Sequence, residues 1–140
     1  MLHCAPLNPI RFPLVERFYQ LNYKVSKPKK DEAIWTLEQN NNIIGAVRFC
    51  QLKQSQLLTG LAIDSQYRRQ GLGLSLLQGV IPQMKQKTCY CFAYKYLQEF
   101  YQQAGFRLVE VNHLPEGLKA RFERYCSSGK NLISMQWANN

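Results

Sequence analysis

Apolar and polar positions alternate along the chain in a way that marks out strands. Apolar runs over Ala33–Gln39 and Ile43–Leu52 predict two strands. The stretch Asn40–Asn42 between them predicts a hairpin turn, because asparagine tolerates left-handed backbone angles. A third apolar run, 57–63, predicts a buried strand beside the second, and the alternation over Thr88–Tyr94 predicts another strand.

Apolar residues at helical spacing predict helices in several places. One helix begins at Pro13, which the first turn of a helix tolerates, and another follows Gly73. The helix after Gly73 meets Pro82, where it should kink or end. Further helices are expected over 97–104 and near Glu116–Cys126.

Short strands are expected near both ends of the chain. One falls within residues 1–10, where two prolines limit it, and two more fall at 107–111 and 131–138. These elements predict an α/β (α+β) fold, with a central mixed, mostly antiparallel sheet of about six to seven strands flanked by about four helices. A chain of 140 residues fits a single domain, so residues 1–140 are expected to form one.

The strand expected at 131–138 has an apolar face formed by Ile133, Met135 and Trp137. This face either packs in the core of the same chain or belongs to a strand that pairs with a second copy. Both a monomer and a homodimer therefore stay open.

Composition and charge narrow the function. A chain with 46% hydrophobic and 12% aromatic residues is globular. No apolar run reaches membrane-spanning length and the first residues lack the pattern of a signal peptide, which predicts a cytoplasmic protein without a membrane partner. The net charge of +9 favours anionic ligands, including nucleic acid. The basic residues are scattered, however, apart from a cluster formed by Lys24, Lys27, Lys29 and Lys30.

The cysteines indicate neither a disulfide framework nor a zinc site. There are five of them, an odd number, and none are spaced as CxxC. Cys89 and Cys91 alternate along a predicted strand, where they are most simply small apolar core residues. No metal is therefore expected.

The stretch Leu57–Leu77 organises the rest of the chain. It comprises a predicted strand, a polar turn, two arginines, a Gly-x-Gly sequence and the start of a helix. Amide groups in the first turn of a helix have no intrahelical acceptors, and glycine lets a ligand approach the backbone. Arg68 and Arg69 add donors that suit phosphate. The stretch is either a phosphate site or a tight joint between strand and helix with surface arginines.

Two motifs indicate a family. The string from Arg68 to Gly73, RRQGLG, resembles the (Arg/Gln)-x-x-Gly-x-(Gly/Ala) signature with which GCN5-related N-acetyltransferases (GNAT) bind the pyrophosphate of acetyl-CoA. The stretch Glu99–Phe106 is similar to the family's helix that carries a tyrosine and ends in Gly-Phe. The resemblance covers roughly residues 33–138. It implies the GNAT fold, acetyl-CoA as cosubstrate, and acetyl transfer to a primary amine by direct attack in a ternary complex.

The resemblance also implies where the cosubstrate binds. The backbone of the strand at 61–63 would pair with the pantetheine arm, and a backbone N–H would stabilise the tetrahedral oxyanion. The residues implied to bind acetyl-CoA are Leu61, Ala62, Ile63, Arg68, Arg69, Gln70, Gly71, Leu72, Gly73 and Leu74.

Tyr101 is the implied general acid for the departing thiolate. A phenol has a reference pKa of about 10, within two units of a thiol at about 8.5, so proton transfer is not steeply uphill. Tyr101 also fits the apolar stripe of Leu97 and Phe100, so packing is the alternative.

The general base stays open. Many members of the family carry a glutamate on the strand that here spans 57–63, and this chain has no carboxylate there. The groups that could accept the proton of the amine are Glu38, Asp64, Glu110, His113 or a water chain.

Two further functions and one loop stay open as well. The missing carboxylate would permit a noncatalytic acyl-CoA sensor, and the charge of +9 would permit a nucleic-acid-associated protein. The loop Lys24–Asp31 either is a solvated linker or touches the acceptor.

Overall fold

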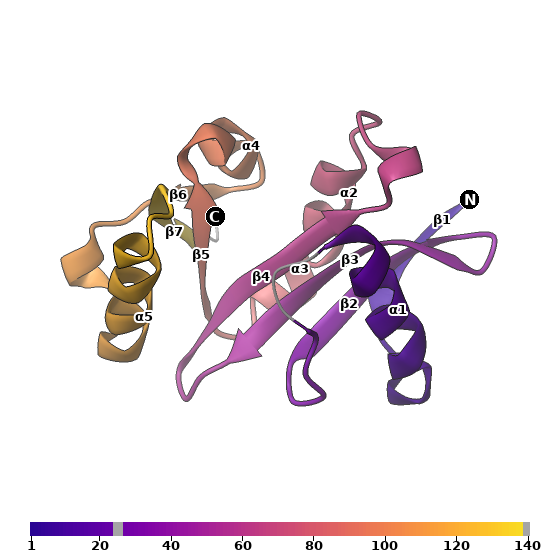
Figure 1. Cartoon of the computed structure of the whole chain (residues 1–140), viewed down its shortest axis with the longest axis horizontal. Coiled ribbons are helices and arrows are strands. Elements are labelled where there is room, and N and C mark those ends of the chain that lie inside the picture. The colour runs from indigo at the N-terminus through magenta and orange to yellow at the C-terminus, as the bar shows by residue number, and fades with distance from the viewer. Residues whose placement is uncertain (24–26, 139–140) are drawn as a thin grey trace.

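The chain folds around one twisted sheet (Figure 1). The computed structural model describes residues 1–23 and 27–138. The strands in these ranges are β1 (Leu2–Pro6), β2 (Ala33–Gln39), β3 (Asn42–Gln51), β4 (Ser55–Ile63), β5 (Thr88–Tyr94), β6 (Phe106–Leu108) and β7 (Leu132–Trp137). Their order in the sheet is β1-β2-β3-β4-β5-β7-β6, and every neighbouring pair is antiparallel except β4 and β5. The predicted mixed, mostly antiparallel sheet is confirmed.

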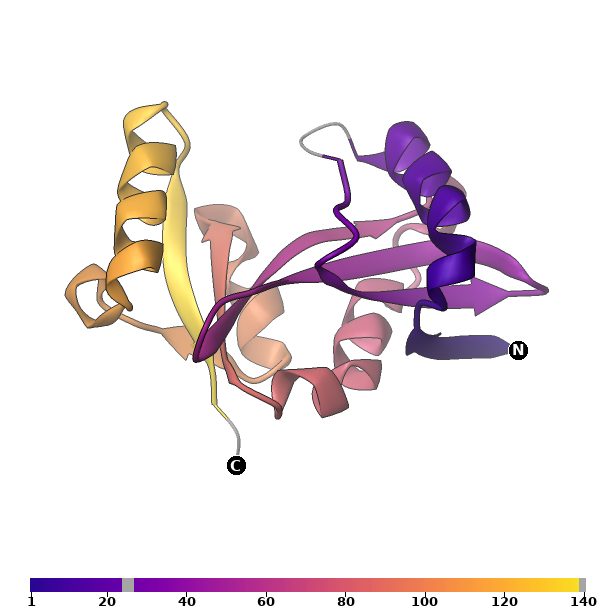
Figure 2. The ribbon, with the colours of Figure 1, turned by 90° about the horizontal axis from the view of Figure 1, so that it is seen from below.

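Helices cover both faces of the sheet. They are α1 (Phe12–Asn22), α2 (Leu72–Gly79), α3 (Ile81–Met84), α4 (Gln98–Gln103) and α5 (Glu116–Ser127). Three apolar clusters join them to the sheet: α2, α3 and α4 pack on one face, and α1 and α5 pack separately on the other. Figure 2 shows α1 and α5 standing on the same side of the sheet, apart from one another.

Local sequence explains where several elements begin and end. Asn40 and Asn41 adopt left-handed φ values of 53° and 68°, which confirms the predicted asparagine turn between β2 and β3. Helix α2 begins at Leu72 and ends at Gly79, and Pro82 lies in the first turn of the next helix, α3. The break predicted at this proline is therefore confirmed, since a proline in a first turn costs no hydrogen bond.

The C-terminal strand lies inside the sheet. β5 pairs with one edge of β7 and β6 with the other, and Met135 at its centre is fully buried. Core packing thus explains the apolar face predicted for this strand. The strand predicted at 107–111 is shorter and earlier, Phe106–Leu108, because Val111–His113 forms a 3-10 turn.

The predicted loop between α1 and β2 is only partly described. Lys24, a member of the predicted basic cluster, lies outside the described residues. In the described part of the loop, Pro28 is buried and the Lys29 N–H donates to Glu32 Oε1 at 2.7 Å.

A bidentate ion pair ties the start of α1 to β2. Arg11 donates from Nη1 and Nη2 to the two carboxylate oxygens of Glu38 at 2.6 and 2.7 Å. Hydrogen bonding to Arg11 lowers the pKa of Glu38 below its ordinary value. A lowered carboxyl pKa stabilises the folded state above the unfolded pKa, and the stabilisation is lost as pH falls through the folded pKa.

Glu38→Gln is expected to lower the free energy of unfolding by about 1 kcal/mol at pH 7, because the charge-assisted pair is lost. The deficit should shrink at pH 3, below the ordinary pKa of a glutamate, because protonation begins to compete with the ionised pair of the wild type there. Urea unfolding at both pH values measures this, with Glu123→Gln on the exposed surface of α5 as control. An equal deficit at both pH values would show that the ionised pair is not the cause.

Candidate active site

The two parallel strands at the centre of the sheet separate part of the way along. Their last paired residues are Leu58 and Cys91, beyond which β4 continues to Ile63 and β5 to Tyr94. Figure 1 shows the strands diverging after this point. Within the described residues, β4 therefore presents an edge over 59–63 that no neighbouring strand pairs with.

The register with β3 determines which backbone groups point to this open edge. The Asp64 N–H donates to the Ile44 carbonyl at 2.8 Å, and bonded and non-bonded positions alternate along an antiparallel pair. Ala62 therefore turns its N–H and C=O towards β3, whereas the C=O of Leu61 and both backbone groups of Ile63 turn towards the open edge. An extended ligand could pair with these two residues.

A capped turn carries the chain from β4 to α2. Asp64 Oδ1 accepts the Gln66 N–H at 2.9 Å and so begins the 3-10 turn Ser65–Tyr67. Arg69 and Gly71 then adopt left-handed φ values of 67° and 74°, and Gly71 is the N-cap of α2. The backbone thus reverses sharply and presents the first amides of α2 to the surface.

A cavity of about 310 Å³ lies beside this turn, between the end of β4, the first turn of α2 and α4. Two arginines at the N-terminus of a helix make it suitable for a phosphate group. Its lining is Ile63, Tyr67, Arg68, Arg69, Gly71, Leu72, Gly73, Leu74, Phe100 and Gln103. Seven of the residues predicted to bind acetyl-CoA are among them.

Three predicted residues do not line the cavity: Leu61, Ala62 and Gln70. Leu61 lies on the open edge of β4, whereas the backbone of Ala62 faces β3. Arg68 lines the cavity and also donates from Nε to the Ile63 carbonyl at 3.1 Å, so it ties the turn to the end of β4.

Tyr101 lies beneath the point where β4 and β5 separate. Only 7% of it is exposed, and its ring packs edge to face on Phe100 and Phe106. Its hydroxyl lies beside the thiol of Cys91, the last residue of β5 that pairs with β4. Burial raises the pKa of the Tyr101 phenol well above its ordinary value and the pKa of the Cys91 thiol to about 12, so both are neutral near pH 7.

The groups considered as the general base have separate surroundings. Glu38 is bound by Arg11, and Asp64 caps the turn after β4. Glu110 and His113 are exposed on the segment between β6 and α5. The geometry therefore singles out none of them.

Three residues that line the cavity were not predicted from the sequence: Tyr67, Phe100 and Gln103. Phe100 also lies close to Gly73, since a Cβ at that glycine would come 3.1 Å from Phe100 Cζ. Their place in the sequence could have indicated two of them, because Tyr67 directly precedes Arg68 and Phe100 directly precedes Tyr101.

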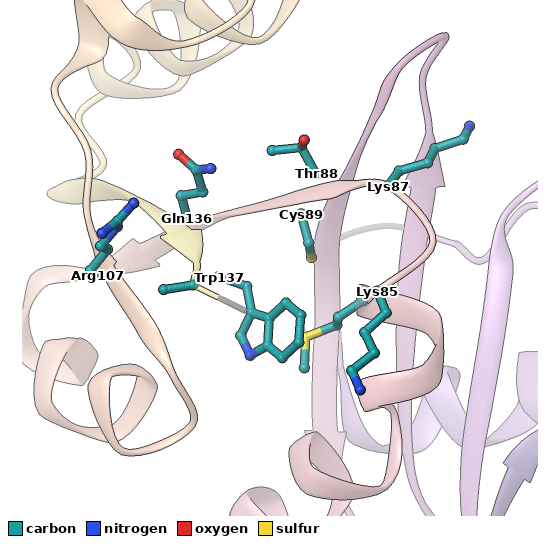
Figure 3. Close-up of a pocket in the computed structure, with 9 residues that line it drawn as sticks. Lys85, Lys87, Thr88, Cys89, Arg107, Gln136 and Trp137 are labelled. Carbon is teal, nitrogen blue, oxygen red and sulfur yellow. The ribbon is translucent and has the colours of Figure 1, made fainter. Parts of the chain in front are cut away.

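A second cavity, of about 330 Å³, lies at the start of β5 (Figure 3). Lys85, Lys87 and Arg107 make it basic, but Figure 3 shows the two lysines extending in different directions. Lys87 Nζ donates to the Leu52 carbonyl at 2.6 Å. The cations of this cavity do not converge, and β4 and β5 separate at the other end of β5. The cavity beside the turn between β4 and α2 is therefore the better candidate for the active site.

Within residues 1–23 and 27–138, no group of three His, Cys, Asp or Glu side chains could hold a metal ion. No helix within the same ranges is long and apolar enough to cross a membrane.

Comparison with known proteins gives a family. The model of the acetyltransferase (GNAT) domain matches residues 14–121. A comparison with curated protein sequences found no match.

Solved structures share the fold at low sequence identity. The ribosomal-protein-S18-alanine N-acetyltransferase from Escherichia coli is 18% identical, with a TM-score of 0.69 over 98% of this chain and 93% of that one. Naa50 from Arabidopsis thaliana, solved with the bisubstrate analogue CoA-Ac-MVNAL, is 13% identical, with a TM-score of 0.71 over 99% of both chains. Rv2747 from Mycobacterium tuberculosis, solved with CoA and NLQ, is 12% identical, with a TM-score of 0.76 over 99% of both chains. At these identities the likeness concerns the fold.

Proposed function

The chain belongs to the acetyltransferase (GNAT) family, and from this premise we propose that it transfers the acetyl group of acetyl-CoA to the nitrogen of a primary amine. One observation carries the proposal. The cavity beside the RRQGLG turn adjoins the end of the open edge of β4, because Ile63 belongs to both, so one ligand could contact the cavity and the strand edge together. Acetyl-CoA has the matching order of groups, a pyrophosphate followed by an extended arm with two amides.

The chain's own groups have distinct parts in binding. The amides at the start of α2, together with Arg68 and Arg69, would hold the pyrophosphate. The C=O of Leu61 and the N–H of Ile63 would pair with the pantetheine amides. Ala62 and Gln70 would make no direct contact with acetyl-CoA, because neither lines the cavity and the backbone of Ala62 pairs with β3.

Transfer then requires a neutral amine at the open end of β4. The amine nitrogen attacks the thioester carbonyl carbon, a C–N bond forms, the C–S bond breaks and the amine loses a proton. A backbone N–H on the open edge would stabilise the negative charge that develops on the carbonyl oxygen. Direct attack needs no covalent enzyme intermediate, so no nucleophilic side chain is required of the chain.

Tyr101 would donate a proton to the departing thiolate. Two features support this role: the phenol lies at the point where β4 and β5 separate, and its raised pKa keeps it protonated near pH 7. The same burial makes the phenol a weaker acid than its reference pKa suggests. Proton transfer would then cost more than the sequence alone indicates.

The test is release of free CoA thiol from acetyl-CoA in the presence of a panel of amines. The panel should include amino acids, peptides with free N-termini, polyamines and aminoglycosides. Amine-dependent thiol release with a matching acetylated product is expected. Tight acetyl-CoA binding without release for any amine would favour a noncatalytic sensor, and absence of acetyl-CoA binding would contradict both functions.

A further inference from the structure

A bulge interrupts β4 where its open edge begins. The register with β3 pairs Arg48 with Thr59 and Ala46 with Ala62, so Gly60 and Leu61 both lie opposite one residue of β3. Gly60 adopts a left-handed φ of 63°, which a residue with a side chain rarely does. The bulge is thus a built feature that re-aims one peptide unit of the strand.

Tyr19 of α1 fixes the orientation of that peptide unit. Its hydroxyl donates to the Gly60 carbonyl at 2.7 Å in a buried hydrogen bond. Because the peptide bond is planar and trans, the carbonyl of Gly60 and the N–H of Leu61 point in opposite directions. Holding the carbonyl towards α1 therefore holds the Leu61 N–H away from α1. A donor on the carbonyl also polarises the peptide and strengthens its N–H as a donor.

We propose that Tyr19 is a positioning residue, which aims and polarises the Leu61 N–H as the donor to the thioester carbonyl oxygen of acetyl-CoA. This inference rests on the proposed function. Leu61 qualifies because it lies on the open edge of β4, beyond Leu58, the last residue of β4 that pairs with β5.

Arg48 supports Tyr19 from β3. It is 2% exposed, its guanidinium lies 4.9 Å from the centre of the Tyr19 ring, and it pairs with Glu32 at 3.6 Å. The same guanidinium occupies the space beside Gly60, where an added Cβ would lie 2.6 Å from Arg48 Nε. Arg48, Tyr19 and Gly60 thus pack against one another, and these contacts hold α1 against the bulge.

The Tyr19 hydroxyl remains a hydrogen-bond donor from neutral to alkaline pH. Burial raises the pKa of the Tyr19 phenol well above its ordinary value, against a smaller lowering by Arg48. Tyr19 therefore stays protonated and continues to donate to the Gly60 carbonyl under alkaline conditions.

Tyr19→Phe tests the proposal, because it removes the hydroxyl and keeps the ring that faces Arg48. Two quantities should separate. The kcat for acetyl transfer should fall by roughly tenfold, while the dissociation constant of CoA, which has no acetyl carbonyl, should stay within about twofold. Tyr90→Phe is the control. It removes a hydroxyl from a tyrosine of β5 that is 7% exposed and packs in the apolar cluster beneath α5, and it should leave both quantities unchanged.

Calorimetry adds a readout that is independent of turnover. The wild type should bind acetyl-CoA more tightly than its thioether analogue, in which a methylene replaces the carbonyl, and Tyr19→Phe should lose this preference. If Tyr19→Phe does not fold, Arg48→Lys takes its place, since it keeps the positive charge without the guanidinium plane beside Gly60.

The outcomes are distinct. An unchanged kcat, or a loss of CoA affinity equal to the loss of kcat, would overturn the positioning role. A wild type that shows the carbonyl preference but acetylates no amine would overturn the proposed function, while loss of that preference in the variant would still support Tyr19.

Discussion

Gly73→Glu is expected to lower the affinity for acetyl-CoA by at least about a hundredfold and to leave the fold intact. Gly73 lines the cavity in the first turn of α2, where the proposed function places the pyrophosphate. Two like charges about 4 Å apart repel by about 4 kcal/mol at an effective dielectric of about 20, which corresponds to several hundredfold in affinity. Calorimetric titration with acetyl-CoA measures the loss.

Two variants control for charge and for bulk. Gly117→Glu makes the same substitution in α5, where an added Cβ would meet no described atom within 4 Å, and should bind acetyl-CoA like the wild type. Gly73→Ala adds only the methyl group that would lie 3.1 Å from Phe100 Cζ, so its loss should be about tenfold or less. A folded Gly73→Glu protein with wild-type affinity would remove the cavity from the binding site.

Tyr101→Phe is expected to reduce kcat by ~10²- to 10⁴-fold, the usual contribution of a general acid. The ring remains to pack on Phe100 and Phe106, so the melting temperature and the CoA affinity should change little. The Cys91 thiol loses its phenol partner, a small cost because a thiol forms weak hydrogen bonds.

The pH dependence gives a second sign of the same role. An acid must be protonated to act, and burial raises the pKa of Tyr101. Loss of this proton should therefore cause no fall in the wild-type rate up to about pH 10. If Tyr101→Phe turns over at the wild-type rate while chemistry limits the reaction, Tyr101 has a packing role and water is the acid.

Local patterns were sufficient to predict the parts of the fold that depend on neighbouring residues. The asparagine turn, the break at Pro82 and the strand Thr88–Tyr94 all follow from propensity and alternation within a few positions. The RRQGLG string could be located from the sequence for the same reason, since its arginines and glycines act within one turn.

Features that depend on distant segments could not be predicted from local patterns. The family resemblance implied a free strand backbone at 61–63, but the residue at which β4 separates from β5 depends on how the two strands pair across the sheet. The bulge at Gly60 depends on Tyr19 and Arg48 from other elements. Glycine in an apolar run gave only a weak signal of that bulge. The apolar stripe of Leu97 and Phe100 indicated that Tyr101 could be buried, but nothing in the sequence indicated its contact with Cys91.

The proposed function requires that the RRQGLG turn and the open edge of β4 form one binding surface for acetyl-CoA. Calorimetry that compares acetyl-CoA with acetyl-pantetheine tests it most directly, because the smaller compound keeps the arm and the thioester but lacks the pyrophosphate. Acetyl-CoA should bind at least about tenfold more tightly, because acetyl-pantetheine lacks the charge-assisted hydrogen bonds to phosphate. Equal affinity for the two compounds would contradict it.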